Sequence, residues 1–229
     1  MKKYLIPIFS LLLATSCIDY NTDSGFSDDN EQNPTENNEV RMWLTTQSKI
    51  YLNKELSIDY TNDITDVVVR IDPSTKYQTI DGFGGTLTGS SAYLLQQMSA
   101  EKRAQVLKDL FDTKEGAGLE SIRIAIGASD FSMDLYTYCD KQGIENFAIP
   151  EIDKRDLIPV LKEILAINPN IKLIASPWSP PAWMKSSGKL NLGTLKGPEV
   201  YDDYATYFVK YVQAMKAEGI TIDAITLQN

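Results

Sequence analysis

Apolar residues along the chain follow two spacings, one typical of helices and one typical of short buried strands. Three segments carry apolar residues three or four positions apart on one face, as helices do: 99–112, 156–167 and 201–218. Four short segments rich in β-branched or apolar residues lie before, between and after them: 77–82, 121–126, 171–175 and 224–227. This alternation predicts a series of βα units built on a parallel sheet.

The ends of the predicted helices carry residues that commonly begin or end a helix. Ser99 is placed to cap the first helix, Pro159 falls in the first turn of the second, and Gly219 follows the third. The segments 121–126 and 171–175 are too short for helices and are apolar enough for buried parallel strands. Both a barrel and a doubly wound sheet contain such units, so spacing alone leaves these two α/β folds open.

Two further stretches precede this series. The segments 40–45 and 67–72 alternate or are rich in β-branched residues, which predicts strands outside the βα units. From residue 41 onward the chain is long enough for one sizeable core, since 43% of all residues are hydrophobic. We therefore expect 41–76 to contribute strands to a side domain and 77–229 to form the βα series.

The N-terminal segment resembles an export signal. Residues 1–16 contain Lys2 and Lys3, an apolar core at 4–14 and then small residues, a pattern too short to cross a membrane. Leu-Ala-Thr-Ser-Cys at 13–17 resembles a bacterial lipobox, in which Cys17 is the lipidated residue; the alternative is an ordinary signal peptide with a chance cysteine. We expect the mature protein to be exported and anchored through lipid in the bacterial outer membrane, facing the periplasm or the cell surface.

Residues 17–40 have the composition of a disordered acidic tether. They are rich in Asp, Glu, Asn, Ser and Thr and contain no Lys or Arg. This tail carries most of the formal net charge of −9, so the acidic balance says little about the folded body. Nothing basic in the chain favours binding to nucleic acid.

The composition also excludes several kinds of catalytic site within the sequence. The chain contains no histidine, which excludes Ser-His-Asp and Cys-His catalysis and histidine-based metal sites. Its two cysteines, Cys17 and Cys139, cannot form a zinc cluster, so no metal is expected. The glycines of 82–85 lack the third glycine of a dinucleotide loop, and no Gly-Lys-Ser/Thr occurs, so no nucleotide cofactor is expected either.

Aromatic and polar residues follow three of the predicted strands: Asp130 and Phe131, Trp178 and Trp183, and Asn229. Sugars need this mixture, because their apolar ring faces stack on indole while their hydroxyls require carboxylate and amide partners. In a TIM barrel such residues would converge at the carboxyl ends of the strands. The alternatives are that the two tryptophans pack their own loop and that the aspartate caps the strand end.

Arg123 lies among the isoleucines of the predicted strand 121–126, where an arginine requires a carboxylate partner. We expect that carboxylate to come from a barrel segment absent from this sequence, with a structural ion pair as the alternative. The glycines of 82–85 predict a tight bend at the barrel rim with close packing. Tyr136 and Tyr138 are expected to pack their loop.

Three runs resemble glycoside hydrolase family 30, the glucosylceramidase-like group: Ile-Asp-Gly-Phe-Gly-Gly at 80–85, Ile-Ala-Ser-Pro-Trp-Ser-Pro-Pro-Ala-Trp-Met at 174–184, and Leu-Gln-Asn at 227–229. The resemblance spans roughly 67–229 and includes the stretch 121–138. It implies a retaining glycosidase with a (β/α)8 TIM barrel and a β-sandwich side domain built from both chain ends. Residues 77–229 would then form the first half of the barrel, about four βα units.

The resemblance also implies roles for individual residues. Asp130 matches an aspartate that binds hydroxyls at the non-reducing end of the sugar, with Phe131, Trp178 and Trp183 as further substrate-binding residues. Arg123 matches an arginine near the nucleophile and would give electrostatic support. Asn229 matches the substrate-binding asparagine that directly precedes the general acid/base glutamate.

Neither catalytic carboxylate of such a mechanism is expected in this sequence. In the family the acid/base follows the asparagine and the nucleophile ends the seventh strand, about 5 to 5.5 Å from it. The chain would thus be the inactive front half of an enzyme for a β-linked glucoside, glucan or glycolipid. Glucosylceramide and β-1,6-glucan are the leading candidate substrates, and β-xyloside and β-galactan are the less favoured ones. The alternatives are a non-catalytic glycan-binding surface lipoprotein and a barrel of another hydrolase family.

Overall fold

A computed structural model describes residues 42–45, 47, 50–56 and 72–229, which belong to two compact units, Met1–Thr79 and Ile80–Asn229. The predicted signal peptide, Cys17 and the acidic tether lie outside the described residues, as does most of the predicted strand 67–72. In the first unit, β1 (Met42–Thr45) pairs with β2 (Ile50–Leu56) in an antiparallel sheet. β1 falls within the predicted strand 40–45, whereas β2 was not predicted.

The second unit contains alternating strands and helices in the described part of the chain. Its strands are β3 (Gly84–Leu87), β4 (Ser121–Ile126), β5 (Lys172–Pro177) and β6 (Ala224–Ile225). Its helices are α1 (Gly89–Gln97), α2 (Ala100–Phe111), α3 (Glu151–Arg155), α4 (Leu157–Ile167) and α5 (Tyr201–Ala217). Three 3₁₀ turns complete it: η1 (Ile144–Asn146), η2 (Ala182–Met184) and η3 (Pro198–Val200).

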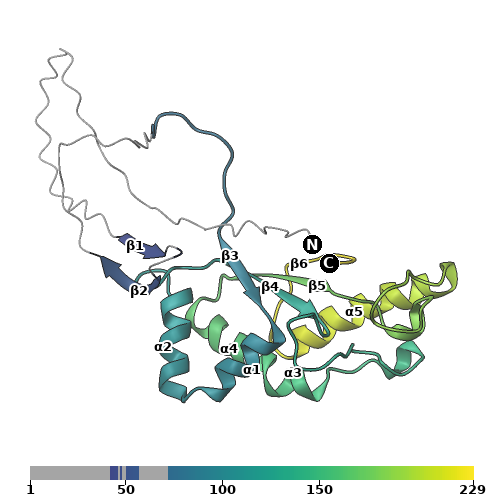
Figure 1. Ribbon diagram of the computed structural model, residues 1–229. Helices are drawn as coiled ribbons and strands as arrows, with labels where there is room; N and C mark the ends of the chain where they lie inside the picture. Colours follow the sequence, from purple (N-terminus) through teal and green to yellow (C-terminus); the bar gives the residue numbers. More distant parts are fainter. Residues whose placement is uncertain (1–41, 46, 48–49, 57–71) are drawn as a thin grey trace, which may run out of the picture. The chain divides into compact units, whose positions relative to one another are not determined.

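The strand order distinguishes a barrel segment from a doubly wound sheet. The four strands are parallel and lie in chain order, β3-β4-β5-β6, so no strand crosses over to the opposite side of the first. The helices α1 to α5 all lie on one side of these strands (Figure 1). A doubly wound sheet reverses its order and carries helices on both faces, whereas a barrel adds each strand beside the previous one. The fold is therefore a parallel α/β fold consistent with part of a TIM barrel.

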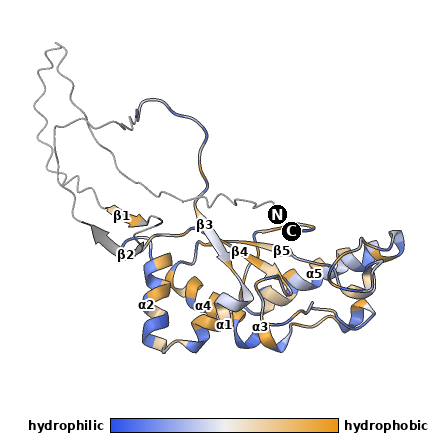
Figure 2. Cartoon of the chain, in the orientation of Figure 1, coloured by the Kyte–Doolittle hydropathy of each residue, from blue (hydrophilic) through white to orange (hydrophobic). Residues whose placement is uncertain are grey.

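The core lies between the sheet and the helices. In β4, Ile122, Ile124 and Ile126 are buried on the helix side and alternate with residues that are partly exposed on the other face. Leu161 and Ile164 of α4 are fully buried and belong to the same core as these isoleucines. Figure 2 shows the corresponding pattern, with hydrophobic colour along β4 and β5 and hydrophilic colour on parts of α2 and α5. In a complete barrel the remaining strands would cover the second face, so one covered face and one open face fit a segment of a barrel.

The predicted helix signals are confirmed where they are local. The Ser99 side chain caps α2 by accepting a hydrogen bond from the Lys102 amide at 3.3 Å. α4 and α5 begin within one residue of their predicted starts, and Gly219, with a φ of 80°, ends α5 as predicted. β4 matches its predicted bounds.

The predicted strand at 77–82 is wrong, because the first strand of this sheet is β3, beginning at Gly84. Pairing with the next strand starts where the amides of Glu120 and Ser121 donate to the Phe83 carbonyl, at 2.8 and 3.2 Å. Gly84 and Gly85 therefore lie at the start of the strand, and Gly82, with a φ of 144°, lies before it. The expected close packing is confirmed at Gly84, where a Cβ would overlap the Ser121 carbonyl, but not at Gly85, where a Cβ would meet no atom within 4 Å. α1 and α3 were not predicted.

Candidate functional site

The side chains of Arg123 and Asn229 meet on the open face of the sheet. Arg123 points away from the helices, because its neighbours Ile122 and Ile124 are the buried residues of β4. Its Nη2 donates a hydrogen bond to Oδ1 of Asn229, which follows β6. The sequence predicted a carboxylate partner for this arginine, whereas the described residues provide the amide oxygen of the asparagine.

This contact orients the amide of Asn229. A guanidinium can only donate hydrogen bonds, so the atom facing it must be the amide oxygen. The Nδ2 group of the same amide is then directed elsewhere and keeps its two hydrogens for another acceptor. Arg123 and Asn229 together present a fixed hydrogen-bond donor at the carboxyl ends of the strands.

Trp178 is joined to the same edge of the sheet through the residues after β6. Its carbonyl accepts a hydrogen bond of 3.3 Å from Nε2 of Gln228. Two residues earlier in each of the two segments, the hydroxyls of Ser176 and Thr226 lie 2.5 Å apart. The Tyr204 hydroxyl, from α5, donates to the Leu227 carbonyl at 2.8 Å and fastens this terminal segment to the helix layer. The indole of Trp178 is half-buried.

Asp130 and Phe131 lie on the loop that follows β4. The carboxylate of Asp130 is exposed and has no hydrogen-bond or salt-bridge partner within the described residues. The Phe131 ring is 65% exposed, but its main chain is held, since its carbonyl accepts from the Ser90 amide at 3.0 Å and its amide donates to Ser129 Oγ at 3.2 Å. Ser90 lies in the first turn of α1, so the loop after β4 is tied to the start of the helix that follows β3.

Trp183 connects two of the loops at this end of the sheet. Its indole Nε1 donates to the Cys139 carbonyl at 2.9 Å, which joins the loop after β5 to the loop after β4. The ring is partly buried and packs against the core. The indole N–H is therefore used within the protein, and a sugar would have to meet this residue through its ring.

A buried carboxylate that the sequence did not single out anchors the loop after β4. Asp153, in α3, is 2% exposed and accepts hydrogen bonds of 2.6 Å from the hydroxyls of both Tyr136 and Tyr138. Burial raises the pKa of the Asp153 carboxyl above its ordinary value, and the two phenol hydrogen bonds partly offset this rise. The two tyrosines thus pack the loop, as predicted, and also hold it to α3. Two tyrosines two positions apart and a nearby acid in a short helix were the available sequence signal.

The structure brings some of the predicted site residues together and leaves others apart. Arg123 and Asn229 are in contact, and Trp178 is one residue removed from them through Gln228. Asp130 and Phe131 lie on the loop after β4, the strand that carries Arg123, and make no hydrogen bond to these three residues. The predicted residues therefore share one end of the sheet but do not form a closed site within this chain.

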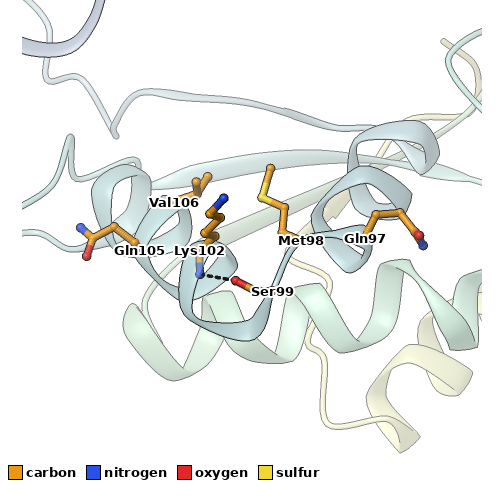
Figure 3. A pocket seen from close by; sticks show the side chains of 6 residues that line it. All are labelled: Gln97, Met98, Ser99, Lys102, Gln105 and Val106. Atoms are coloured by element: carbon orange, nitrogen blue, oxygen red, sulfur yellow. Dashed lines mark hydrogen bonds between the residues drawn. The ribbon is translucent and has the colours of Figure 1, made fainter.

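A hollow of about 590 Å³ lies elsewhere, at the junction of α1 and α2 (Figure 3). Six residues line it: Gln97, Met98, Ser99, Lys102, Gln105 and Val106. It contains no carboxylate and no aromatic ring, and it shares no residue with the strand ends. None of the predicted sugar-binding residues lines it, so this hollow is not the candidate site.

The described part of the chain has neither a cluster of metal ligands nor a membrane-spanning helix. No group of three His, Cys, Asp or Glu residues lies close enough there to hold a metal ion. None of the helices there combines the length and the apolar character that a membrane crossing requires.

Comparison with known proteins connects this arrangement to one family. Residues 80–229 match the family model described as the glycosyl hydrolase family 30 TIM-barrel domain. Lysosomal acid glucosylceramidase of Mus musculus is 33% identical over 173 residues, which cover 72% of this chain and 33% of that protein. An endo-1,6-β-D-glucanase of Trichoderma harzianum is 37% identical over 175 residues, covering 69% and 36%. The chain thus spans about a third of the length of these curated relatives.

This chain is also similar to solved structures. The endo-β1,6-glucanase BT3312 is 51% identical with a TM-score of 0.64, over 69% of this chain and 36% of that one. SrfJ from Salmonella typhimurium is 31% identical with a TM-score of 0.67, over 77% of this chain and 40% of that one. The parallel strands described above are therefore consistent with part of the TIM barrel that the family model describes.

Proposed function

The chain belongs to glycosyl hydrolase family 30, and on this basis we propose that it supplies the sugar-binding half of a retaining β-glycoside hydrolase. The observation that carries the proposal is the contact between Arg123 and Asn229, which presents an amide donor at the carboxyl ends of the strands. The main chain of Trp178, whose ring would stack on the sugar, is hydrogen-bonded to Gln228 next to Asn229. Asp130 lies on the loop after β4, and its carboxylate is unpaired among the described residues. Phe131 and Trp183 complete the proposed sugar-binding set.

The proposed reaction is a double displacement by two carboxylates outside this sequence. A general acid glutamate directly after Asn229 would protonate the leaving oxygen, and a nucleophilic carboxylate at the end of the seventh strand would form a covalent glycosyl-enzyme. Water would then release the sugar with the acid residue acting as base. Arg123 would stabilise the charge near the nucleophile as well as orient Asn229.

The proposed substrate is a β-linked glucoside, and β-1,6-glucan is placed first. The 51% identity to an endo-β1,6-glucanase supports this order, and the 33% identity to a glucosylceramidase keeps glucosylceramide as the next candidate. β-Xyloside and β-galactan follow. No metal or cofactor is proposed, because the two carboxylates carry the chemistry.

Hydrolysis by the protein expressed from its whole reading frame tests this proposal. We expect release of reducing sugar from a linear β-1,6-glucan, with slower or no release from a β-1,3-glucan, and we expect the codon after Asn229 to encode glutamate. The segment 1–229 expressed alone serves as the control and is expected to show no turnover, since the general acid is outside it. A stop codon directly after Asn229, together with retained glycan binding, would instead support a non-catalytic glycan-binding surface lipoprotein.

We also propose that strands from 41–76 belong to a β-sandwich side domain and that Cys17 carries a lipid anchor. The antiparallel pairing of β1 with β2 supports the first proposal, and the lipobox-like run at 13–17 supports the second. Cys17→Ser is expected to abolish acyl labelling and to release the mature protein from the membrane fraction, because the acyl chains supply the affinity for the bilayer. Membrane retention that is unchanged by Cys17→Ser would refute the anchor.

A further inference from the structure

The loop after β5, residues 178–197, carries Trp178 at its first position. Two main-chain hydrogen bonds close it into a narrow hairpin, from the Ser186 amide to the Thr194 carbonyl at 2.8 Å and from the Lys196 amide to the Met184 carbonyl at 2.9 Å. Apart from the 3₁₀ turn η2, the hairpin has no helix or strand. Side-chain contacts must therefore supply much of what fixes its shape.

Lys185 lies inside this hairpin. The residue is only 5% exposed, and its Nζ donates to Ser179 Oγ at 3.1 Å and to the Leu190 carbonyl at 2.5 Å. Ser179 is also buried, at 4% exposure, and its hydroxyl donates to the same Leu190 carbonyl at 2.8 Å. The ammonium thus joins the first turn of the loop, next to Trp178, to the segment near its tip.

Among the described residues, the charge of Lys185 has no acidic partner. None of the ion pairs found among the described residues includes it, and burial lowers the pKa of its ammonium below the ordinary value. An uncharged side chain of the same length would fill the space without this desolvation penalty. What the ammonium adds is its pair of charge-assisted hydrogen bonds, which are roughly twice as strong as neutral ones.

These bonds act on the main chain beside Trp178. The Trp178 carbonyl is held from one side by Gln228, and the next residue, Ser179, is held from the other side by Lys185. Pro180 and Pro181 follow and restrict the backbone further. The indole therefore projects from a short stretch of chain that is fixed at both ends.

We propose that Lys185 is a positioning residue that, through Ser179, holds the Trp178 ring in place to stack on a sugar. The stacking part rests on the proposed function, in which Trp178 contacts the substrate. The positioning part rests only on the contacts within the hairpin. Lys185 would then influence substrate binding without touching the substrate.

The first test needs no substrate. The protein is labelled with 5-fluorotryptophan, and the ¹⁹F resonance of Trp178 is assigned from its loss in Trp178→Phe. Lys185→Met, which keeps the length of the side chain and removes its donors, is expected to shift or broaden the Trp178 resonance. The matched control is Lys189→Met, which removes the charge of an exposed lysine in the same hairpin and is expected to leave that resonance unchanged.

The second test measures kinetics with the protein expressed from its whole reading frame. Lys185→Met is expected to raise KM for the β-glucan about tenfold while changing kcat less than twofold, because a misplaced aromatic ring loses stacking energy of about 1.4 kcal/mol. Ser179→Ala should have the same effect. The KM of the double variant should be no higher than that of either single variant, because both changes break the same hydrogen bond between Lys185 and Ser179.

The outcomes separate this inference from the proposed function. A Trp178 resonance that is unchanged in folded Lys185→Met, or additive KM effects of Lys185→Met and Ser179→Ala, would overturn the positioning role. If Lys185→Met fails to fold, the resonance in Ser179→Ala decides the same question. A protein without glycosidase activity whose Trp178 resonance still responds to Lys185→Met and not to Lys189→Met would refute the proposed function and support the positioning role.

Discussion

Replacing Asn229 by alanine in the protein expressed from its whole reading frame is expected to lower kcat by about a hundredfold or more, equivalent to roughly 2.7 kcal/mol. Arg123 holds the amide oxygen of Asn229, so the amide nitrogen is left to donate to the 2-hydroxyl of the bound sugar. That hydrogen bond strengthens as the sugar gains oxocarbenium character, and its loss should slow the reaction more than it weakens binding. Steady-state kinetics on an aryl β-glucoside measure both effects.

The 2-deoxy analogue of the same substrate is the control. If the amide acts through the 2-hydroxyl, Asn229→Ala should slow hydrolysis of the 2-deoxy glucoside far less than that of the parent glucoside. Trp178→Ala and Asp130→Ala remove contacts made throughout the reaction and should raise KM as well as lower kcat/KM. Equal slowing of both substrates by Asn229→Ala would show that the amide does not act through that hydroxyl.

Asp153→Ala is expected to lower the free energy of unfolding by about 3 kcal/mol or more. The change leaves the buried hydroxyl of Tyr138 and the partly buried hydroxyl of Tyr136 without their acceptor, and a buried donor left unpaired costs about 1 to 3 kcal/mol. Urea unfolding followed by circular dichroism measures the loss. The matched control is Glu151→Ala, which removes an exposed acid from the same helix and should change stability by less than about 1 kcal/mol.

The pH dependence of this loss provides a second check. Because the pKa of Asp153 is raised in the folded protein, its carboxyl favours folding most below its ordinary value of 3.8, and that contribution falls as the pH rises through the folded-state pKa. The loss caused by Asp153→Ala should therefore be larger near pH 4 than at pH 7. A loss that grows with rising pH would contradict the raised pKa.

Tyr211 offers a contrasting substitution in the same aromatic cluster. Its ring packs 5.2 Å from that of Tyr138, but its buried hydroxyl has no hydrogen-bond partner among the described residues. Tyr211→Phe should therefore be neutral or stabilise the protein by about 1 kcal/mol, whereas Tyr138→Phe should destabilise it. Destabilisation by both changes would show that Tyr211 has a polar partner after all.

The local features of the fold could be predicted from the sequence. The alternation in β4 and the Ser99 cap of α2 involve residues close together in the chain, so their pattern is visible in the sequence. β3 was misplaced because its pairing depends on the close approach of Gly84 to Ser121, and a glycine has no side chain from which to read a face. The consecutive strand order also required the structure, because a doubly wound sheet fits the same pattern of elements.

The location of the site residues at one end of the sheet was predictable, because parallel topology determines it. Residues directly after parallel strands must lie at one end of the sheet, which is where Asp130, Trp178 and Asn229 are found. The partner of Arg123 was not predictable, since it lies 106 positions away in the chain. Asp153 and Lys185 were missed because charged residues are normally exposed, and only tertiary contacts bury these two.

The stereochemistry of the first product tests the central claim most directly. The protein expressed from its whole reading frame is mixed with a β-glucan, and the anomeric protons of the new reducing ends are followed by ¹H NMR before mutarotation. A retaining enzyme of the proposed kind should release the β anomer first. Release of the α anomer first, or no hydrolysis of any β-glucoside, would contradict the account.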